Sequence, residues 1–338
     1  MTDTQHALAL FDLITAHRIT ASLYTAAELG VADALAEGPC TTGELSVAVD
    51  APESALWRLL RVLVTIGVCR RVGAGKFELT PVGQHLAGSS PQSLKAWAIF
   101  EGKMLQPSWG DLINSVHSGK TRAELDGVAS SFDLMARDPR HVETFNAAMR
   151  DLTRLTIPSV LAAYDFSCIS RLIDVGGGTG ELLAEVLLAY PSLCGAVFDQ
   201  AACARQAQER FRDAGLGDRA EFIAGDFFDS IPGGADAFIL KSTIHDWNDE
   251  RSAGILANCR KALPETGKLI LVERIMPEAP ADDADDRASA LSDLNMLRGP
   301  GGQERTAHEY KVLLNAAGFR IARIVSAGRF SLIEAMAA

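Results

Sequence analysis

The chain has 338 residues, 48% hydrophobic and 22% charged, so it can bury a large core, and its length predicts two domains. Its formal net charge of −11 disfavours the attraction to phosphate backbones on which nucleic-acid-binding proteins depend, so we expect no nucleic-acid partner. No apolar run approaches the roughly 18 residues of a membrane span, and the first residues do not have the pattern of a signal peptide. We therefore expect a cytoplasmic protein with no membrane partner.

The six cysteines are scattered along the chain, with no CxxC pair and no histidine at ligand spacing. We expect reduced, mostly buried thiols and no metal site.

Residues 1–90 are predicted to form short helices followed by a β-hairpin. Apolar residues recur at helical spacing over 21–36. Two pairs of residues have the form of a capping box, which marks the start of a helix: Thr41 with Glu44, and Asp50 with Glu53. Strands at 68–72 and 76–80 flank a glycine-rich turn. Helices followed by such a wing predict a mainly helical winged-helix domain.

A winged-helix domain often binds DNA, so the helix that would enter the groove decides its role. Residues 56–63 are mainly Leu, Val and Trp, and Arg58 and Arg61 are the only charged residues. An apolar helix of this kind packs against protein, and we expect the domain to serve dimerisation.

Residues 91–166 are predicted to form a helical connector. Six aromatic and methionine residues stand out along it: Trp97, Phe100, Trp109, Phe132, Phe145 and Met149. Such residues at helical spacing more often belong to a core than to a pocket. However, this segment joins two domains, and pockets favour such junctions. Both interpretations stay open for each residue.

From residue 167 to 338, strands and helices alternate, which is typical of a parallel α/β sheet. The predicted strands are 172–175, 195–198, 221–224, 237–240 and 268–273, with a closing antiparallel pair at 320–325 and 331–336. The acidic stretch 278–286 is predicted to be a solvated loop. Thr306 and Glu309 are predicted to cap a helix.

A glycine-rich turn follows the first of these strands. The glycines are Gly176, Gly177, Gly178 and Gly180. Glycines between a strand and a helix let the backbone approach a ligand at a helix N-terminus. Asp199 ends the next strand, roughly 20 residues past the turn, where a doubly wound fold holds a ribose hydroxyl. The pattern indicates a nucleoside-binding site.

Two cofactors compete for this site. A dinucleotide fingerprint has glycine at its first, third and sixth positions, but here Gly176 and Gly178 are followed by Glu181. A carboxylate at that position would face a pyrophosphate unfavourably. The GxGxG spacing resembles the first motif of S-adenosylmethionine (SAM) methyltransferases, whose cofactor has no phosphate. We favour SAM over NAD, and both over a purely structural turn.

Four polar residues fall at predicted strand ends, where ligands bind in open parallel sheets: Asp199, Asp226, His245 and Glu273. Asp226 could accept a hydrogen bond from an adenine amino group while Phe227 packs beside the base. Alternatively, Asp226 could simply cap a turn or a helix.

His245 is the predicted general base. A phenol has a pKa near 10 and is a poor nucleophile until its proton leaves, and a histidine poised near neutral pH can take that proton. A carboxylate on the other ring nitrogen would fix the tautomer and stabilise the imidazolium. Glu273 and Glu304 are the candidates, although either could be an ordinary surface acid.

Five motifs occur in order along the chain: DVGGGTG at 174–180, GDFF at 225–228, LKSTIHDWNDE at 240–250, LVERIMP at 271–277, and DLNML followed by GGQERT within 293–306. Over essentially its whole length the chain thereby resembles the SAM-dependent O-methyltransferases that act on small aromatic acceptors. The resemblance implies a doubly wound, Rossmann-like SAM-binding domain and an N-terminal domain that forms an intertwined homodimer.

The resemblance also implies roles for individual residues. Contacts to SAM, which becomes S-adenosylhomocysteine (SAH), fall on Gly176, Asp199, Asp226, Phe227 and Lys241. His245 is the base, with Glu273 and Glu304 beside it, and the acceptor pocket draws on Phe145, Met149, Asn295 and Met296. Asn295 is polar where the plant enzymes tend to be apolar, so the acceptor does not transfer with the family.

Three alternatives remain to be tested. Some family members bind SAM but catalyse decarboxylation or hydroxylation, and retention of His245 argues against this activity here. A nicotinamide-dependent oxidoreductase and a non-catalytic winged-helix regulator that senses SAM are less favoured.

Overall fold

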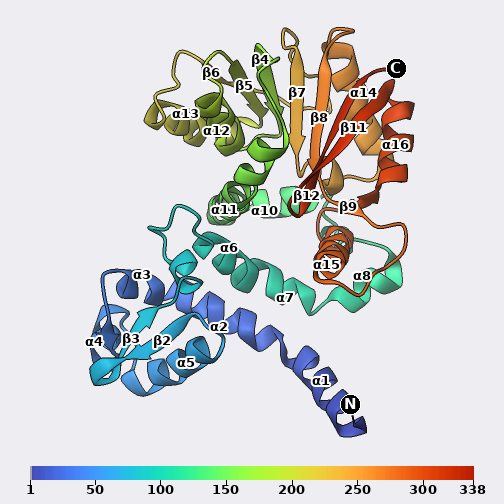
Figure 1. The fold of residues 1–338 in the computed structure, drawn as a ribbon. Coiled ribbons are helices and arrows are strands. Elements are labelled where there is room, and N and C mark those ends of the chain that lie inside the picture. Colours follow the sequence, from blue (N-terminus) through green and yellow to red (C-terminus); the bar gives the residue numbers. More distant parts are fainter. Residues whose placement is uncertain (1) are drawn as a thin grey trace. The chain divides into compact units, whose positions relative to one another are not determined.

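A computed structural model describes residues 2–338 and divides the chain into two compact units (Figure 1). The first unit contains the residues up to Gly110 together with Arg140–Leu152, and the second contains Asp111–Pro139 together with Thr153–Ala338. Within residues 2–338, no helix has the length and hydropathy that crossing a bilayer requires.

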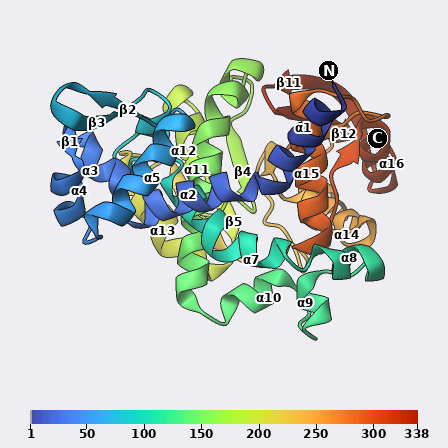
Figure 2. The same cartoon turned by 90° about the horizontal axis from the view of Figure 1, so that it is seen from below.

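The first unit is built from helices and a small sheet (Figure 2). Its first elements are α1 (Asp3–Thr15), α2 (His17–Glu28), α3 (Val31–Ala36), β1 (Cys40–Thr41), α4 (Thr42–Ala48), α5 (Glu53–Thr65), β2 (Cys69–Val72) and β3 (Lys76–Leu79). They are followed by η2 (Gly83–Leu86), α6 (Lys95–Phe100), η3 (Glu101–Leu105) and α7 (Gln106–Trp109). The strands form an antiparallel sheet in the order β1-β3-β2, which confirms the predicted winged-helix arrangement.

Helix α5 forms much of the core of this unit. Leu56, Leu60 and Leu63 lie on one face and are each at most 2% exposed, because a spacing of three and four residues places side chains on the same face. Thr41 and Glu44 form the predicted capping box. The second predicted box is wrong. Helix α5 begins after Pro52, and Asp50 instead occupies a left-handed conformation with φ of 48°.

Helix α1 has no buried residue, although it is rich in apolar side chains. Five of them are between 56% and 69% exposed: Leu8, Leu10, Phe11, Leu13 and Ile14. A contiguous exposed apolar surface of this kind marks a site of association.

The second unit contains a seven-stranded sheet in the order β11-β12-β8-β7-β4-β5-β6. Its strands are β4 (Arg171–Val175), β5 (Cys194–Asp199), β6 (Ala220–Ala224), β7 (Ala237–Lys241), β8 (Lys268–Glu273), β11 (Phe319–Ala327) and β12 (Phe330–Ala337). The strands β4 to β8 are mutually parallel, and β12 is antiparallel to both β8 and β11. The predicted strands and the closing antiparallel pair are confirmed.

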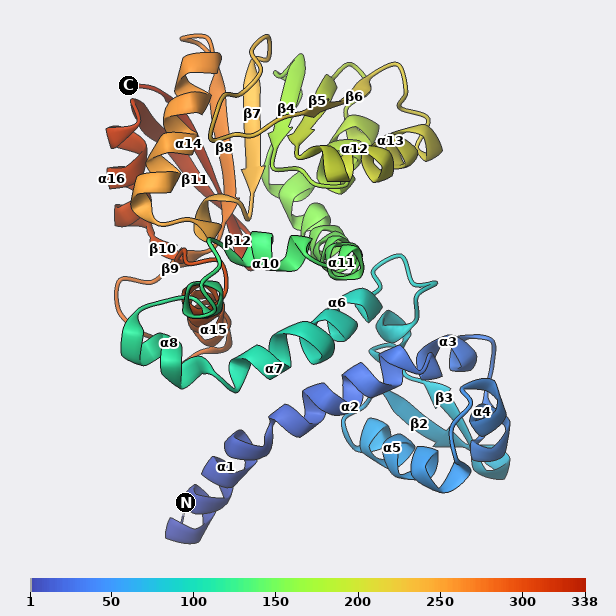
Figure 3. The same ribbon diagram turned by 180° about the vertical axis from the view of Figure 1, so that it is seen from behind.

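Helices cover both faces of this sheet. One core joins it to α12 (Glu181–Ala189), α13 (Ala204–Asp213) and the end of α11 (Pro139–Ala163). The other joins it to α14 (Asp249–Ala262) and α16 (Ala307–Ala316), which lie against the sheet in Figure 3. Strand β8 contributes Ile270 and Val272 to the first core and Leu269 and Leu271 to the second. Continuous apolar strands follow from burial on both faces.

Two further segments complete the second unit. They contain α8 (Leu112–Ser118), α9 (Arg122–Leu125), α10 (Ser131–Ala136), β9 (Ile275–Met276), α15 (Ala284–Arg298) and β10 (Arg305–Thr306). The predicted loop at 278–286 is only partly correct, because α15 starts within it. Asp283 caps this helix by accepting hydrogen bonds from two backbone N–H groups, and acidic residues are favourable in a first turn.

Candidate active site

The order of the strands determines where a ligand can bind. From β4 the chain moves outward to β5 and β6, and then returns to place β7 on the other side of β4. Such a reversal leaves a crevice at the C-terminal ends of the two central strands. Gly176 directly follows β4, and His245 lies in the turn after β7. The predicted cofactor and base residues therefore come to one edge of the sheet.

The loop after β4 requires glycine for two reasons. Gly176, Gly178 and Gly180 all have positive φ, between 56° and 78°. In addition, a β-carbon on Gly176 would lie 3.0 Å from the Thr243 hydroxyl, and one on Gly180 would lie 2.8 Å from the Phe211 ring. Helix α12 starts after Gly180 with no side-chain cap, so its first N–H groups are open to a ligand.

Asp199 fixes this loop. Its carboxylate accepts hydrogen bonds from Gly178 N at 2.8 Å and Gln200 N at 2.6 Å. Burial raises its pKa, and the two backbone donors oppose that effect. The ribose contact predicted for Asp199 remains a prediction, and the structure adds a role in shaping the loop.

Asp174 lies beside the glycine loop, and sequence reasoning did not single it out. It lies at the end of β4, and its buried Oδ2 has no hydrogen-bond partner among the described residues. Burial raises its pKa to about 7, and the charge of Lys241 on the neighbouring strand opposes the rise. An acid inside an apolar strand, separated from the glycines only by Val175, was the signal that could have identified it.

Glu181 does not have the role that its sequence position suggested. Its carboxylate is buried and pairs with Arg154 at 3.1 Å and Arg210 at 3.1 Å. It ties α12 to α11 and α13, and its charge is neutralised there. The argument that Glu181 would repel a pyrophosphate is therefore wrong, because the carboxylate is held by the two arginines.

Asp226 and Phe227 lie at the turn after β6. Asp226 Oδ1 accepts a hydrogen bond from Phe228 N at 2.8 Å, which is the turn role left open by the sequence. The Phe227 ring packs edge-on against Phe228 and Trp247, with centroids 4.9 Å and 6.1 Å away. Contacts of this pair with an adenine remain a prediction.

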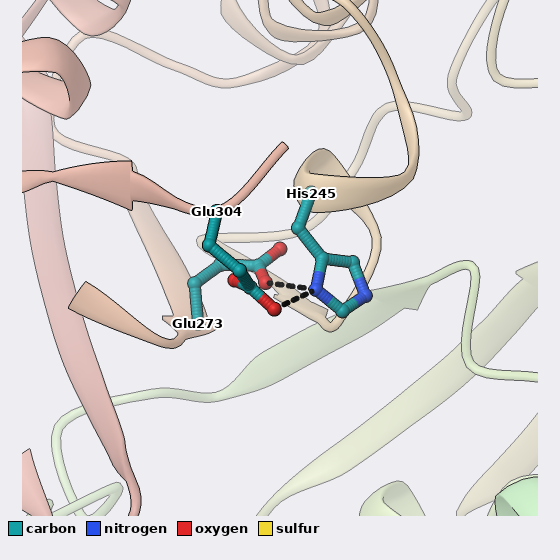
Figure 4. Close-up of side chains that lie close together, drawn as sticks. All are labelled: His245, Glu273 and Glu304. Atoms are coloured by element: carbon teal, nitrogen blue, oxygen red, sulfur yellow. Dashed lines mark hydrogen bonds and ion pairs between the residues drawn. The ribbon is translucent and has the colours of Figure 1, made fainter. Parts of the chain in front are cut away.

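The predicted base and both candidate carboxylates come together (Figure 4). His245 Nδ1 lies 3.0 Å from Glu304 Oε1 and 3.8 Å from Glu273 Oε2. Both glutamate side chains are fully buried, whereas the His245 side chain is 12% exposed. Its other nitrogen, Nε2, lies on the opposite side of the ring, 3.6 Å from Asp246 Oδ1. Nδ1 thus faces the two glutamates, and Nε2 faces Asp246.

Glu273 holds the backbone of the loop that carries His245. Its Oε1 accepts hydrogen bonds from Thr243 N at 3.0 Å and Ile244 N at 2.8 Å. Neither glutamate is a surface acid, so that alternative is excluded for both.

Glu304 is positioned by residues that sequence reasoning did not identify. Ser292 Oγ donates to Glu304 Oε1 at 2.6 Å, and Glu304 N donates to Asp293 at 2.9 Å. Arg305, fully buried, donates to the carbonyls of Ile244 and Trp247 on either side of the histidine. These contacts lock the glutamate loop and the histidine loop together.

The charges of this cluster make His245 more basic than expected. Burial acts to lower its pKa, but the charges of Glu273, Glu304 and Asp246 outweigh burial and raise it to about 10. Burial raises the pKa of Glu273 to about 7 and that of Asp246 to about 6. For Glu304, burial is outweighed by His245 and Ser292, and its pKa is lowered. The sequence predicted a pKa near neutrality for His245, whereas the charges of the cluster raise this pKa to about 10.

The same three groups are also a candidate donor set for a cation. His245, Glu273 and Glu304 each offer one ligand atom, all within 4.8 Å of one another. The expectation of no metal site remains a prediction, which activity after EDTA treatment checks.

The residues predicted for the acceptor pocket lie on two helices. Phe145 and Met149 belong to α11 in the first unit, where Phe145 packs edge-on against Phe100 with centroids 5.7 Å apart. Asn295 and Met296 belong to α15 in the second unit. Met296 is 6% exposed, and Asn295 accepts a hydrogen bond from Arg298.

Comparison with known proteins adds an independent line of evidence. The family models of the O-methyltransferase domain and of the O-methyltransferase dimerisation domain match residues 109–320 and 11–89, respectively. Phenazine O-methyltransferase PhzM of Lysobacter antibioticus is 38% identical over 96% of this chain and 95% of that protein.

Solved structures show the same architecture. Human N-acetylserotonin methyltransferase in complex with SAM matches with a TM-score of 0.90 and 28% identity over 100% of both chains. The O-methyltransferase NcsB1 from neocarzinostatin biosynthesis, in complex with SAM and 2-hydroxy-5-methyl naphthoic acid, matches with a TM-score of 0.77 and 30% identity. That match covers 94% of this chain and 96% of the other.

Proposed function

This chain belongs to the family of SAM-dependent O-methyltransferases, and from that premise we propose that it methylates a phenolic or enolic hydroxyl of a small aromatic metabolite with His245 as general base. The prediction of a SAM-dependent O-methyltransferase with a Rossmann-like sheet and a dimerisation domain is confirmed. The observation that carries the catalytic proposal is the pairing of His245 Nδ1 with two buried glutamates, which leaves Nε2 facing away from them.

The residues at the sheet edge fit SAM. The glycine loop and the uncapped start of α12 offer backbone N–H groups, and Asp199 stands where a ribose is held in this fold. The unpartnered Asp174 oxygen suits the cationic amino group of the methionine end. Asp226, Phe227 and Lys241 are proposed to complete the site. When bound, SAM supplies an electrophilic methyl group on a sulfonium.

His245 is proposed to take the proton of the acceptor hydroxyl at Nε2. Its Nδ1–H donates to Glu304, which fixes the tautomer. Glu273 holds the loop that carries His245 by accepting hydrogen bonds from two backbone N–H groups. A phenol has a pKa near 10, and the raised pKa of His245 is close to this value, so the proton transfer is nearly balanced. A base must be unprotonated to act, so this raised pKa predicts that methyl transfer is fastest at alkaline pH.

The acceptor is proposed to be aromatic, and Asn295 and Met296 of α15 are its proposed contacts in the second unit. The relatives support this class. One is a phenazine methyltransferase, another is named for a 2,7-dihydroxy-5-methyl-1-naphthoate, and NcsB1 is bound to a hydroxynaphthoic acid. One relative is instead named an N,N-dimethyltransferase, so assays include arylamines beside phenols.

We further propose that the enzyme is a homodimer in which α1 packs against the partner copy. The chain carries the family's dimerisation domain, and burial of the exposed apolar residues of α1 against another protein surface would be favourable. Size-exclusion chromatography with light scattering checks this. Deletion of residues 2–15 is expected to weaken the dimer, and Val47→Glu, on an exposed position outside α1, serves as a control.

The main experiment incubates purified protein with methyl-labelled SAM and a panel of phenols, naphthols and hydroxynaphthoic acids. We expect label transfer and one SAH per methylated product. His245→Ala should lower kcat by about 10²- to 10⁴-fold, while the affinity for SAH stays within a few-fold. His308→Ala, an exposed histidine of α16, is the matched control. Full activity of His245→Ala on every accepted substrate would refute the role of this base.

The same preparation tests the alternatives. Calorimetry with SAH and with NADH compares the two cofactors, and a salt-dependent gel shift tests DNA binding. Loss of carbon dioxide or gain of oxygen without methyl transfer would indicate a decarboxylase or hydroxylase. The division at residues 90 and 166 and the cytoplasmic location also remain proposals, which limited proteolysis and cell fractionation check.

A further inference from the structure

Arg274 stands directly beside the catalytic cluster without being part of it. It follows Glu273 at the end of β8, and its guanidinium lies over the Phe330 ring, 4.9 Å from the centroid. The ammonium group of Lys241 lies 5.9 Å from the centroid of the same ring. Phe330 packs against the core on the face of the sheet that α11 and α12 cover. Arg274 is thereby held at the edge of the sheet that carries the cofactor residues.

Arg274 is half-buried and has no oxygen atom in direct contact, although the charges of Glu304 and Asp285 reach it. Other buried or half-buried arginines of the second unit have an oxygen partner: Arg122, Arg154, Arg171, Arg210, Arg219, Arg260, Arg298 and Arg305. Among residues 2–338, the Arg274 guanidinium makes no hydrogen bond and no ion pair, and it lies over the Phe330 ring. Burying a charged group is costly unless it is paired.

The surroundings of Arg274 increase its need for an anion. Burial lowers the pKa of Arg274, the charges of Glu304 and Asp285 oppose that effect, and the charge of Arg329 adds to it. Glu304 itself is committed to His245 and Ser292. Arg329 is exposed in the turn between β11 and β12 and, among residues 2–338, likewise makes no hydrogen bond or ion pair. Two arginines close together and both unpaired form a site for a negatively charged group.

The chemistry of the site favours a carboxylate. A planar guanidinium matches a carboxylate through two parallel hydrogen bonds. A doubly charged phosphate would meet more repulsion from Glu304 and Asp285, whose charges both reach Arg274. A single negative charge on a flat group fits the two arginines and the ring better.

We propose that Arg274, supported by Arg329 and stacked on Phe330, binds the carboxylate of a small molecule held at this edge of the sheet. The inference rests on the proposed function and extends it. The carboxylate is either that of the amino-acid end of the cofactor or one borne by the aromatic acceptor. An acceptor of the second kind is a hydroxylated aromatic acid.

Two pairs of ligands separate these sources by calorimetry. SAH and 5′-methylthioadenosine share the adenosine thioether, but only SAH has the amino-acid carboxylate. 2-Hydroxy-1-naphthoate and 2-naphthol, each titrated into the SAH complex, differ only by a carboxylate. Arg274→Gln is expected to weaken the carboxylated member of one pair by about 10- to 100-fold, the range of a charge-assisted hydrogen bond. The other member should change less than about twofold. Loss in the first pair identifies the cofactor, and loss in the second identifies the acceptor.

Two further variants keep the result interpretable. Arg274→Lys keeps the charge but not the planar guanidinium that makes two parallel hydrogen bonds. It should give an intermediate loss of affinity for the carboxylated ligand, even if Arg274→Gln folds poorly. Arg320→Gln is the control, since it is exposed on the same hairpin but pairs with Met336 at the opposite edge of the sheet. The inference is overturned if neither carboxylated ligand loses affinity, or if both members of each pair weaken equally. Wild-type protein that fails to bind SAH would overturn the proposed function, and this inference with it. If the wild-type protein binds SAH and transfers methyl groups, the proposed function holds, and the Arg274 variants then test only the carboxylate site.

Discussion

Replacement of Glu304 by glutamine should shift the pH dependence of methyl transfer to lower pH. The charge of Glu304 and its 3.0 Å hydrogen bond to Nδ1 both help to raise the pKa of His245 to about 10. A base must be unprotonated to act, so the rate should rise with pH through the pKa of this histidine, well above neutrality. Glutamine keeps the shape of the side chain but removes the charge that stabilises the imidazolium.

The size of the shift follows from the strength of the lost interaction. A hydrogen bond to a charged group contributes about 1.5–3 kcal/mol. At about 1.4 kcal/mol per pH unit, the acidic limb of kcat/KM should move down by about 1–2 units. The plateau should also fall, by about 10-fold or more, because a weaker and less firmly oriented base transfers the proton less well.

The assay measures kcat/KM for a phenolic acceptor between pH 6 and 11 at saturating SAM. Glu304→Asp keeps the charge and should move the limb little while lowering kcat. Glu250→Gln, at an exposed position on α14, should change neither. A limb that stays in place or moves to higher pH in Glu304→Gln would refute the electrostatic reasoning.

Three further changes test other parts of the second unit. Glu181→Gln leaves two arginines without their buried counter-charge and should cost about 2–3 kcal/mol of unfolding free energy, measured by urea denaturation. Gly176→Ala combines a positive φ of 75° with a 3.0 Å approach to Thr243, so SAH affinity should fall at least about 10-fold by calorimetry. Tyr164→Phe removes a 2.6 Å hydrogen bond to Glu334 and should cost about 1–2 kcal/mol at neutral pH. Because the pKa of Glu334 is lowered, that cost should disappear as the pH falls through it, which thermal melts at several pH values would show.

Much of the fold could be predicted because its signals are local. The strands of the sheet appear as short apolar runs, and the capping boxes at Thr41 and Thr306 lie within four residues of sequence. The prediction failed where the same short sequence pattern is compatible with two local structures. The acidic stretch that begins α15 was taken for a solvated loop, although acids also favour the first turn of a helix. Asp50 has the spacing of a cap, but Pro52 takes that position.

The sequence also identified strand ends as the place of chemistry, because parallel strands bring their C-terminal ends to one edge. It could not decide between structural and functional roles for the acids found there. Asp199 and Asp226 accept hydrogen bonds from the backbone, and the charge of Glu181 is neutralised by two arginines. Those partners lie on other elements or depend on the exact turn.

Alternation of apolar strands and helices and the glycine turn were enough to predict the class of fold, and the resemblance of five motifs to the SAM-dependent O-methyltransferases implied the class of reaction. Only the folded chain brought Glu304, 59 residues further along, within 3.0 Å of His245 Nδ1, and left Arg274 without a partner beside them. Secondary structure is encoded within windows of a few residues, whereas the charge around a buried side chain is the sum over neighbours from distant segments. The basicity of His245 and the demand for an anion at Arg274 are therefore properties of the tertiary structure alone.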